Sequence, residues 1–229
     1  MTQALSAVAR TPLHHWHAAH DAVFAQRDGW QVVAQYANQE HEMEARSNLA
    51  LADISATAKL SLRGKGVLAA AQGLGGAAAA PRGVSLLHGG ILACRLTDEH
   101  LMLLASNSSI SLVELQQCCG GPRLVWDDVT SAYAGFLVVG SRTDDLLRRL
   151  TPLDIRPGAF PANSCAETSV AGVEALLMRW AEPAISFLRI YVSWDLAEYV
   201  WTRIMEAGEE LQIAPMGVVA LAGLGTKSA

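Results

Sequence analysis

The chain is poor in charge and in aromatic residues. Asp, Glu, Lys and Arg make up 17% of its 229 residues, aromatics 6%, and the formal net charge is -5. A hydrophobic share of 51% excludes a disordered chain. The acidic balance and the scarcity of aromatics disfavour a basic groove that stacks nucleic-acid bases. We expect a folded globular protein without a nucleic-acid partner.

Long apolar runs are also missing. The longest uncharged stretches, residues 66–81 and 211–226, are shorter than the roughly 20 residues of a membrane helix and contain Gly and Pro. The N-terminal residues show no basic start followed by an apolar segment, which a secretory signal would have. We expect no membrane contact and a cytoplasmic location.

Several chemical motifs are absent from the sequence. It has four cysteines without a C-x-x-C, and no P-loop, G-x-S-x-G elbow or H-E-x-x-H. Four of the seven histidines lie in LHHWHAAH, where His14, His17 and His20 share a helical face. No carboxylate or thiolate nearby completes a metal site. We expect a surface helix there and no bound metal.

The first half of the chain alternates between helix and strand patterns. Asn38 looks like an N-cap, and residues 39–51 after it have acids early and Arg46 further on, as a helix of about three turns would. Residues 54–63 alternate apolar and polar side chains, which predicts a strand with one face in water. A short helix from residue 67 should then end in a Gly- and Ala-rich loop before Pro81.

Short apolar runs within residues 84–106 predict a meander of three strands. Asn107 or Ser108 then caps a predicted helix over residues 109–117. Further strands are expected near residue 124 and over 132–140, and a helix over 144–150. This mixture of strand pairs and single helices is typical of an α+β fold.

Residues 151–164 contain three prolines and predict a linker or crossover. Strands over 173–180 and 185–193 follow, and then a helix over 195–207 that Gly208 should end at its C-cap. We therefore divide the chain into an N-terminal α+β part, residues 1–150, and a second α+β part, residues 151–229.

Two stretches carry a resemblance to a known family. They begin at PLHHWH and at DEHLMLL, and the order and spacing of short motifs within them resemble the glycine cleavage system T-proteins, the folate-binding aminomethyltransferases. The chain is also similar to a shorter relative, the gamma subunit of heterotetrameric sarcosine oxidase. The first stretch matches the family at Gly29-Trp30, Gln35-Tyr36, Arg46 and Asp53-Ile54-Ser55.

The resemblance implies two packed α+β subdomains around a central folate-binding cavity, without the C-terminal barrel domain of full-length T-proteins. It implies tetrahydrofolate as a cofactor. Asn107 and Tyr36 match family positions and are candidate folate contacts. The alternative interpretation is a turn cap for Asn107 and a half-buried packing aromatic for Tyr36.

The catalytic residues of the family are not all present. In the family an acidic residue follows a G-G-[IV]-[IVL] motif, and this chain has Ala93 and Cys94 there. Neither can act as a carboxylate. The G-Y-T-G-E segment, whose Glu contacts the pterin in the family, is missing from the corresponding residues 165–180. We assign no catalytic residue, although Asp53 and Asp128 remain candidates.

These features predict a T-protein-like, tetrahydrofolate-binding module of one-carbon metabolism with a degenerate site for aminomethyl or methyl transfer. If active, it would be a tetrahydrofolate-dependent aminomethyltransferase or a demethylase-type transferase. The alternative is a non-catalytic gamma-type subunit of a heteromeric complex like sarcosine oxidase. The low share of charged residues predicts apolar surface that a protein partner or a second copy of the chain covers. The expected small ligand is a folate or a methylamine-type compound.

Overall fold

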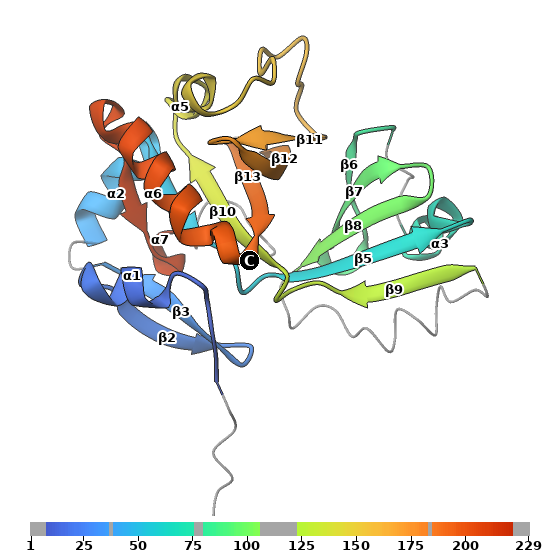
Figure 1. Cartoon of the computed structure of the whole chain (residues 1–229), viewed down its shortest axis with the longest axis horizontal. Coiled ribbons are helices and arrows are strands. Elements are labelled where there is room, and N and C mark those ends of the chain that lie inside the picture. The colour runs from blue at the N-terminus through green and yellow to red at the C-terminus, as the bar shows by residue number, and fades with distance from the viewer. Residues whose placement is uncertain (1–7, 37–38, 76–79, 106–122, 183–184, 222–229) are drawn as a thin grey trace, which may run out of the picture.

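The computed structural model describes residues 8–36, 39–75, 80–105, 123–182 and 185–221. Its strands form three sheets, which we call sheets A, B and C (Figure 1). Sheet A has the order β1-β3-β2, with β1 (Ala9–Arg10), β2 (Val23–Arg27) and β3 (Trp30–Gln35).

Sheet B has the order β11-β12-β13-β10-β4-β14 and is antiparallel except where β14 pairs with β4. Its strands are β4 (Ala50–Asp53), β10 (Tyr133–Val139), β11 (Ser164–Val170), β12 (Val173–Glu182), β13 (Ile185–Ser193) and β14 (Ala214–Met216). Strands from both sides of residue 150 thus share one sheet, and the division of the chain at that residue stays a prediction.

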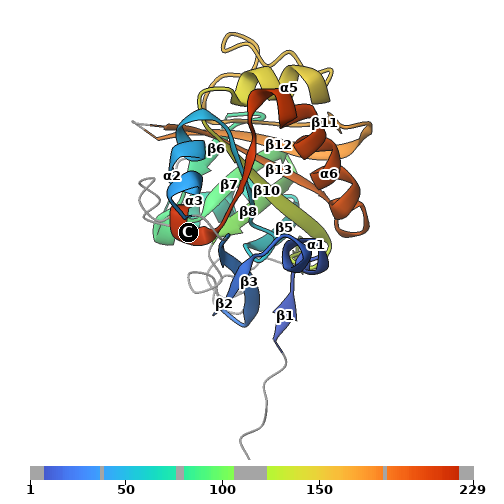
Figure 2. The ribbon, with the colours of Figure 1, turned by 90° about the vertical axis from the view of Figure 1, so that its left-hand side faces the viewer.

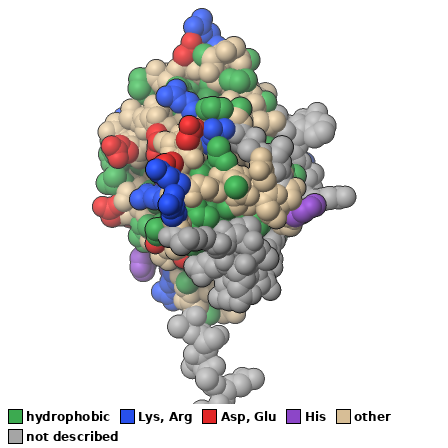
Figure 3. All heavy atoms as spheres, turned by 90° about the vertical axis from the view of Figure 1, so that its right-hand side faces the viewer, with side chains coloured by type: hydrophobic (Ala, Val, Ile, Leu, Met, Phe, Trp, Pro, Cys, Tyr) green, Lys and Arg blue, Asp and Glu red, His purple; other side chains and the backbone are tan. Residues whose placement is uncertain are grey.

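Sheet C is an antiparallel sheet with the order β6-β7-β8-β5-β9. Its strands are β5 (Ala58–Gly64), β6 (Val84–Leu86), β7 (Leu92–Thr97), β8 (His100–Ala105) and β9 (Leu124–Asp128). The predicted meander is therefore confirmed as β6, β7 and β8. Sheet C forms the right-hand part of the molecule in Figure 1, and side chains of both charge signs lie close together on that end (Figure 3).

Helices pack around the sheets, so the predicted α+β class is confirmed. They are α1 (His14–Ala19), α2 (Gln39–Asn48), α3 (Val67–Gly73), α5 (Thr143–Leu150), α6 (Ala197–Gly208) and α7 (Val218–Leu221), with short 3-10 turns at His88–Gly90, Trp194–Leu196 and Glu209–Leu211. Among the described residues no helix is long and apolar enough to cross a membrane.

The largest part of the core lies between sheet B and the helices α5 and α6. Alternate residues of the central strands, such as Phe136 and Ile190, point to this side and are fully buried. Helix α5 contributes Leu146 and Leu147, and α6 contributes the buried Trp201. Figure 2 shows both helices on the same side of the sheet. This packing leaves the other face of sheet B to meet sheet C.

Sheet C also uses its two faces differently. One face holds Leu60, Leu62 and Leu103 and is covered by the apolar side of α3. The opposite face carries Cys94, Met102 and Leu104, which cluster with Leu176, Met178 and Tyr191 of sheet B. Sheets B and C therefore pack against each other through one face each.

Most local predictions agree with the structure, with two qualifications. Helix α2 begins with acids and carries Arg46 in its last turn, as predicted, and residues 151–163 contain no helix or strand. Asn38, Asn107, Ser108 and the helix predicted over residues 109–117 lie outside the described residues. Gly208 was expected to end α6 in a C-cap, but a 3-10 turn continues from it, and the left-handed residue is Gln212.

Candidate functional site

A cavity of about 510 Å³ lies between the facing surfaces of sheets B and C. This volume is in the range of small-molecule and cofactor sites. Sheet C lines it with Lys59, Arg63, Leu96, His100, Met102 and Leu104, and sheet B with Tyr133, Glu167, Thr168, Ser169, Glu174, Ala175, Leu176 and Tyr191. The wall is thus partly apolar, with a few ionisable groups from both sheets.

The polar row of β5 forms one wall of the cavity. Alternation along the strand is as predicted, but the polar face is not in water: Lys59 and Ser61 are each 1% exposed. Arg63, at the end of the row, is exposed. The prediction of a wet face was wrong because periodicity shows which side chains share a face, and sheet B covers this one.

The hairpin of β11 and β12 supplies the acidic groups. Its strands are joined by two residues, Ala171 and Gly172, both at positive φ as in a tight primed turn. Because Val170 pairs with Val173, Ser169 lies opposite Glu174 and Glu167 opposite Leu176. All four residues line the cavity. Both glutamates are exposed, so they stand where the cavity meets solvent.

Tyr191 forms part of the buried wall on β13. Its ring lies over Gly135 of the neighbouring strand β10, where an added Cβ would come within 2.8 Å of the Tyr191 ring. The residue is 2% exposed, and its hydroxyl makes no hydrogen bond of standard geometry among the described residues. Burial raises the pKa of Tyr191, and the neighbouring Arg189 side chain opposes this. The cavity therefore presents a protonated hydroxyl that a ligand could satisfy.

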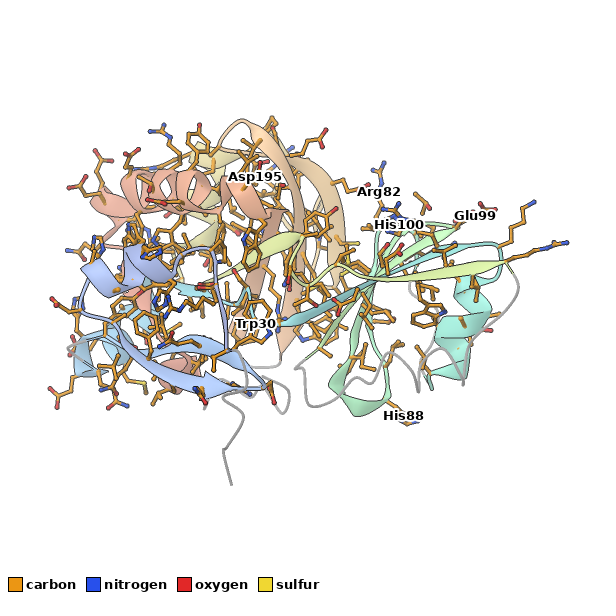
Figure 4. All side chains as sticks on the ribbon, turned by 60° about the horizontal axis from the view of Figure 1, so that its bottom comes forward. Trp30, Arg82, His88, Glu99, His100 and Asp195 are labelled. Carbon is orange, nitrogen blue, oxygen red and sulfur yellow. The ribbon has the colours of Figure 1, made fainter. Side chains whose placement is uncertain are left out.

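His100, at the start of β8, is held in its neutral form. Its Nε2 lies 3.1 Å from Ser61 Oγ and accepts from Arg63 Nε at 3.4 Å. Burial and the Arg63 charge lower the pKa of His100, and Glu167 on the opposite sheet opposes them. Figure 4 places His100 on sheet C near Glu99. His100 and Glu167 thus face each other across the cavity.

The position of the family acid is filled by uncharged side chains. Ala93 is 1% exposed and packs on the face of sheet C that α3 covers. Cys94 points to sheet B, where its Sγ lies 3.2 Å from Met178 Sδ. A hydrogen bond to Cys165 and burial raise the pKa of the Cys94 thiol. A protonated, sealed thiol is a poor nucleophile.

A second buried polar cluster surrounds Asp53. Asp53 Oδ2 lies 3.1 Å from His17 Nε2, and Oδ1 accepts from the Ser55 amide at 2.9 Å. Burial alone would raise the pKa of Asp53, but these hydrogen bonds outweigh it and the pKa lies below its ordinary value. The prediction of a surface helix at α1 is thus only partly right, because His17 of this helix is completely buried. The described residues contain no cluster of three metal-ligating side chains.

Tyr36 belongs to this cluster. Its hydroxyl lies 2.7 Å from His17 Nδ1, and its amide donates to the carboxylate of Glu42. Burial and the carboxylates of Asp53 and Glu42 raise the pKa of Tyr36, so its hydroxyl stays protonated beside the His17 imidazole. Tyr36 is not among the cavity-lining residues above, and Asn107 lies outside the described part of the chain. Their contact with folate stays a prediction.

The fold and the cavity allow the chain to be compared with known proteins. The family model described as the GCVT N-terminal domain matches residues 13–226, almost the whole chain. The chain belongs to this family. The resemblance seen in the sequence motifs is thereby confirmed.

Several curated proteins that are similar to this chain are named aminomethyltransferases. The one from Desulfitobacterium hafniense is 27% identical, in an alignment that covers 91% of this chain and 61% of that protein. The one from Moorella thermoacetica is 25% identical, with the same coverage. The chain thus spans about 60% of the length of these relatives.

Two solved structures share the fold. The glycine cleavage system aminomethyltransferase T from Bartonella henselae superposes with a TM-score of 0.77 at 15% identity, over 93% of this chain and 60% of that one. A chain of the heterotetrameric sarcosine oxidase from Corynebacterium sp. U-96 gives a TM-score of 0.67 at 24% identity, over 90% of this chain and 97% of that one. Both similarities show a shared fold.

Proposed function

We propose that the chain is a T-protein-like, tetrahydrofolate-binding module of one-carbon metabolism whose site for aminomethyl or methyl transfer is degenerate. Its membership of the GCVT N-terminal domain family supports this proposal. The observation that carries it is the cavity between sheets B and C, which has the volume of a cofactor site and groups suited to a folate.

The wall fits a pteridine ring in three respects. Met102, Leu104 and Leu176 offer apolar surface for a flat ring. The Tyr191 hydroxyl is buried and makes no hydrogen bond of standard geometry among the described residues. The Glu174 carboxylate can accept two hydrogen bonds from the paired N–H groups of the pteridine edge. Hydrogen bonds of this kind are strong because the acceptor is charged. Tetrahydrofolate would supply the nitrogen that carries the one-carbon unit.

Loss of the acid supports the degenerate part of the proposal. With Ala93 and Cys94 at the family position, no carboxylate stands there to stabilise charge during transfer. Glu167 and Glu174 lie on the opposite sheet, at the mouth of the cavity. They are placed to bind and orient a ligand, and we assign them no role in the transfer itself.

Isothermal titration with tetrahydrofolate and with its 5-formyl form tests the proposal. Binding to the wild type is expected, and Glu174→Gln should weaken it about tenfold through loss of a charged hydrogen bond. Glu198→Gln is the matched control, because Glu198 is an exposed residue on α6, on the far side of sheet B. Absence of binding to the wild type at high micromolar concentration would refute the proposal.

A second candidate is a non-catalytic subunit of a heteromeric, sarcosine-oxidase-like complex. The sarcosine oxidase chain is matched over 97% of its length, so in that assembly this fold makes up nearly a whole chain. The edge strands β6 and β9 of sheet C expose Leu86 and Val125 by 53% and 57%. Exposed apolar residues on sheet edges are typical of surfaces that a partner covers.

The two candidates differ in the behaviour of the isolated protein. A subunit should self-associate when purified alone and become monodisperse when a larger partner is co-expressed. Light scattering after gel filtration measures this directly. A stable monomer that binds tetrahydrofolate would count against the subunit.

A further inference from the structure

Lys59 is a buried lysine with an unusual set of partners. It lies on β5, lines the cavity and is 1% exposed. Its Nζ lies 2.8 Å from the carbonyl oxygens of Ser55 and Thr57, both in the turn that precedes the strand. The ion pairs among the described residues do not include Lys59.

The two carbonyl partners are sufficient for a neutral amine. A neutral amine has two N–H groups, which the two carbonyl oxygens accept, and one lone pair. Burial lowers the pKa of Lys59 to about 7, although the more distant carboxylates of Asp53 and Asp128 oppose this. A considerable fraction of Lys59 is therefore uncharged near neutral pH, which is the nucleophilic form of the side chain.

The other charged groups of the cavity stand further along its walls. Arg63 belongs to sheet C, beside the neutral His100, and Glu167 and Glu174 belong to the hairpin of sheet B. The described cavity lining contains no other lysine. The amine of Lys59 is thus the group in this wall that can form a covalent bond with an uncharged carbonyl compound.

We propose that Lys59 captures a small aldehyde that enters the cavity, by forming a reversible imine. An aldehyde is the carbonyl class expected, because its carbon is less hindered than that of a ketone and can reach a side chain that is almost wholly buried. The proposal goes beyond tetrahydrofolate binding and does not require it.

The bonds in this step balance without an oxidant or reductant. The Nζ lone pair attacks the carbonyl carbon, and the oxygen takes up a proton to give a carbinolamine. Loss of the hydroxyl group as water, with the second N–H proton released, leaves a C=N bond. The overall change is amine plus aldehyde to imine plus water, and hydrolysis reverses it.

Competitive reductive alkylation tests the proposal on the whole protein. The chain has three lysines. The exposed Lys65, which directly follows β5, serves as an internal reference. The folded protein is treated briefly with formaldehyde and cyanoborohydride at about pH 7, and peptide mass spectrometry gives the extent of alkylation at each lysine. Lys59 should react at least about tenfold faster than Lys65, because an ordinary lysine has a pKa near 10.4 and is almost entirely protonated there.

Two controls make the result decisive. After unfolding in urea, Lys59 and Lys65 should react at similar rates, since the advantage depends on the folded cavity. In Lys59→Arg the fast-reacting site should disappear while alkylation of Lys65 is unchanged. Equal or slower reaction of Lys59 in the folded wild type would overturn the proposal.

The alkylation test of Lys59 and the titration test of folate binding can succeed or fail independently. Alkylation uses formaldehyde alone, without a folate, and titration with tetrahydrofolate uses no aldehyde. A protein that binds tetrahydrofolate but leaves Lys59 unreactive refutes only the imine. A protein with a fast-reacting Lys59 and no folate binding refutes only the folate module.

Discussion

Replacing Lys59 with methionine should change how the stability of the protein depends on pH. Burial holds the pKa of Lys59 at about 7 in the folded state, whereas an unfolded lysine has a pKa near 10.4. Between these values the unfolded chain binds more protons than the folded one. The free energy of unfolding of the wild type, relative to Lys59→Met, should therefore rise as the pH rises from 7 towards 10.

The magnitude follows from the two pKa values. One proton of difference changes the free energy of unfolding by up to about 1.4 kcal/mol per pH unit. Because Lys59 is half-protonated at its folded pKa, the expected gain between about pH 7 and 9 is about 2 kcal/mol. Methionine has a similar length and no titrating group, so the difference between the two proteins isolates the amine.

Urea unfolding at several pH values measures this difference. The matched control is Lys65→Met, which removes an exposed lysine from the end of the same segment and should give a flat profile. A flat or falling profile for Lys59→Met would refute the reasoning, because it would mean that the folded state holds Lys59 in its charged form over this range.

Two further substitutions test the packing and the buried polar cluster. Gly135→Ala places a Cβ 2.8 Å from the Tyr191 ring, and this overpacking should destabilise the protein by about 1–3 kcal/mol in urea unfolding; Gly158→Ala, which meets nothing within 4 Å, should be close to neutral. Asp53→Asn should cost about 2–3 kcal/mol, because the hydrogen bond between His17 and a charged partner is lost. Since the folded pKa of Asp53 is lowered, the advantage of the wild type should be full above about pH 4 and decline as the pH falls through the folded pKa; an advantage that persists unchanged in acid would contradict this account.

Local sequence patterns predicted the elements well where neighbours along the chain determine them. Helix α5 follows from the spacing of Leu146, Leu147 and Leu150, and α2 from its acids and Arg46. The same reasoning predicted β5 but placed its polar row in water. Which surface covers a row of side chains depends on contacts with distant strands, and a strand period contains no information about them.

The candidate site was harder to predict for the same reason. The sequence did not identify Glu167 and Glu174 as site residues, because no family motif covers their segment. A signal was present: Ala171-Gly172 between two alternating runs is compatible with a two-residue hairpin, which would have placed Ser169 opposite Glu174. The burial of His17 against Asp53 joins residues 36 positions apart, and local periodicity does not predict such contacts.

A crystal structure with tetrahydrofolate tests the central claim most directly. The account predicts electron density for the pteridine ring between sheets B and C, with its N–H edge at Glu174 and a hydrogen bond to the Tyr191 hydroxyl. Density for the ligand elsewhere, or an empty cavity in crystals grown at saturating tetrahydrofolate, would contradict it.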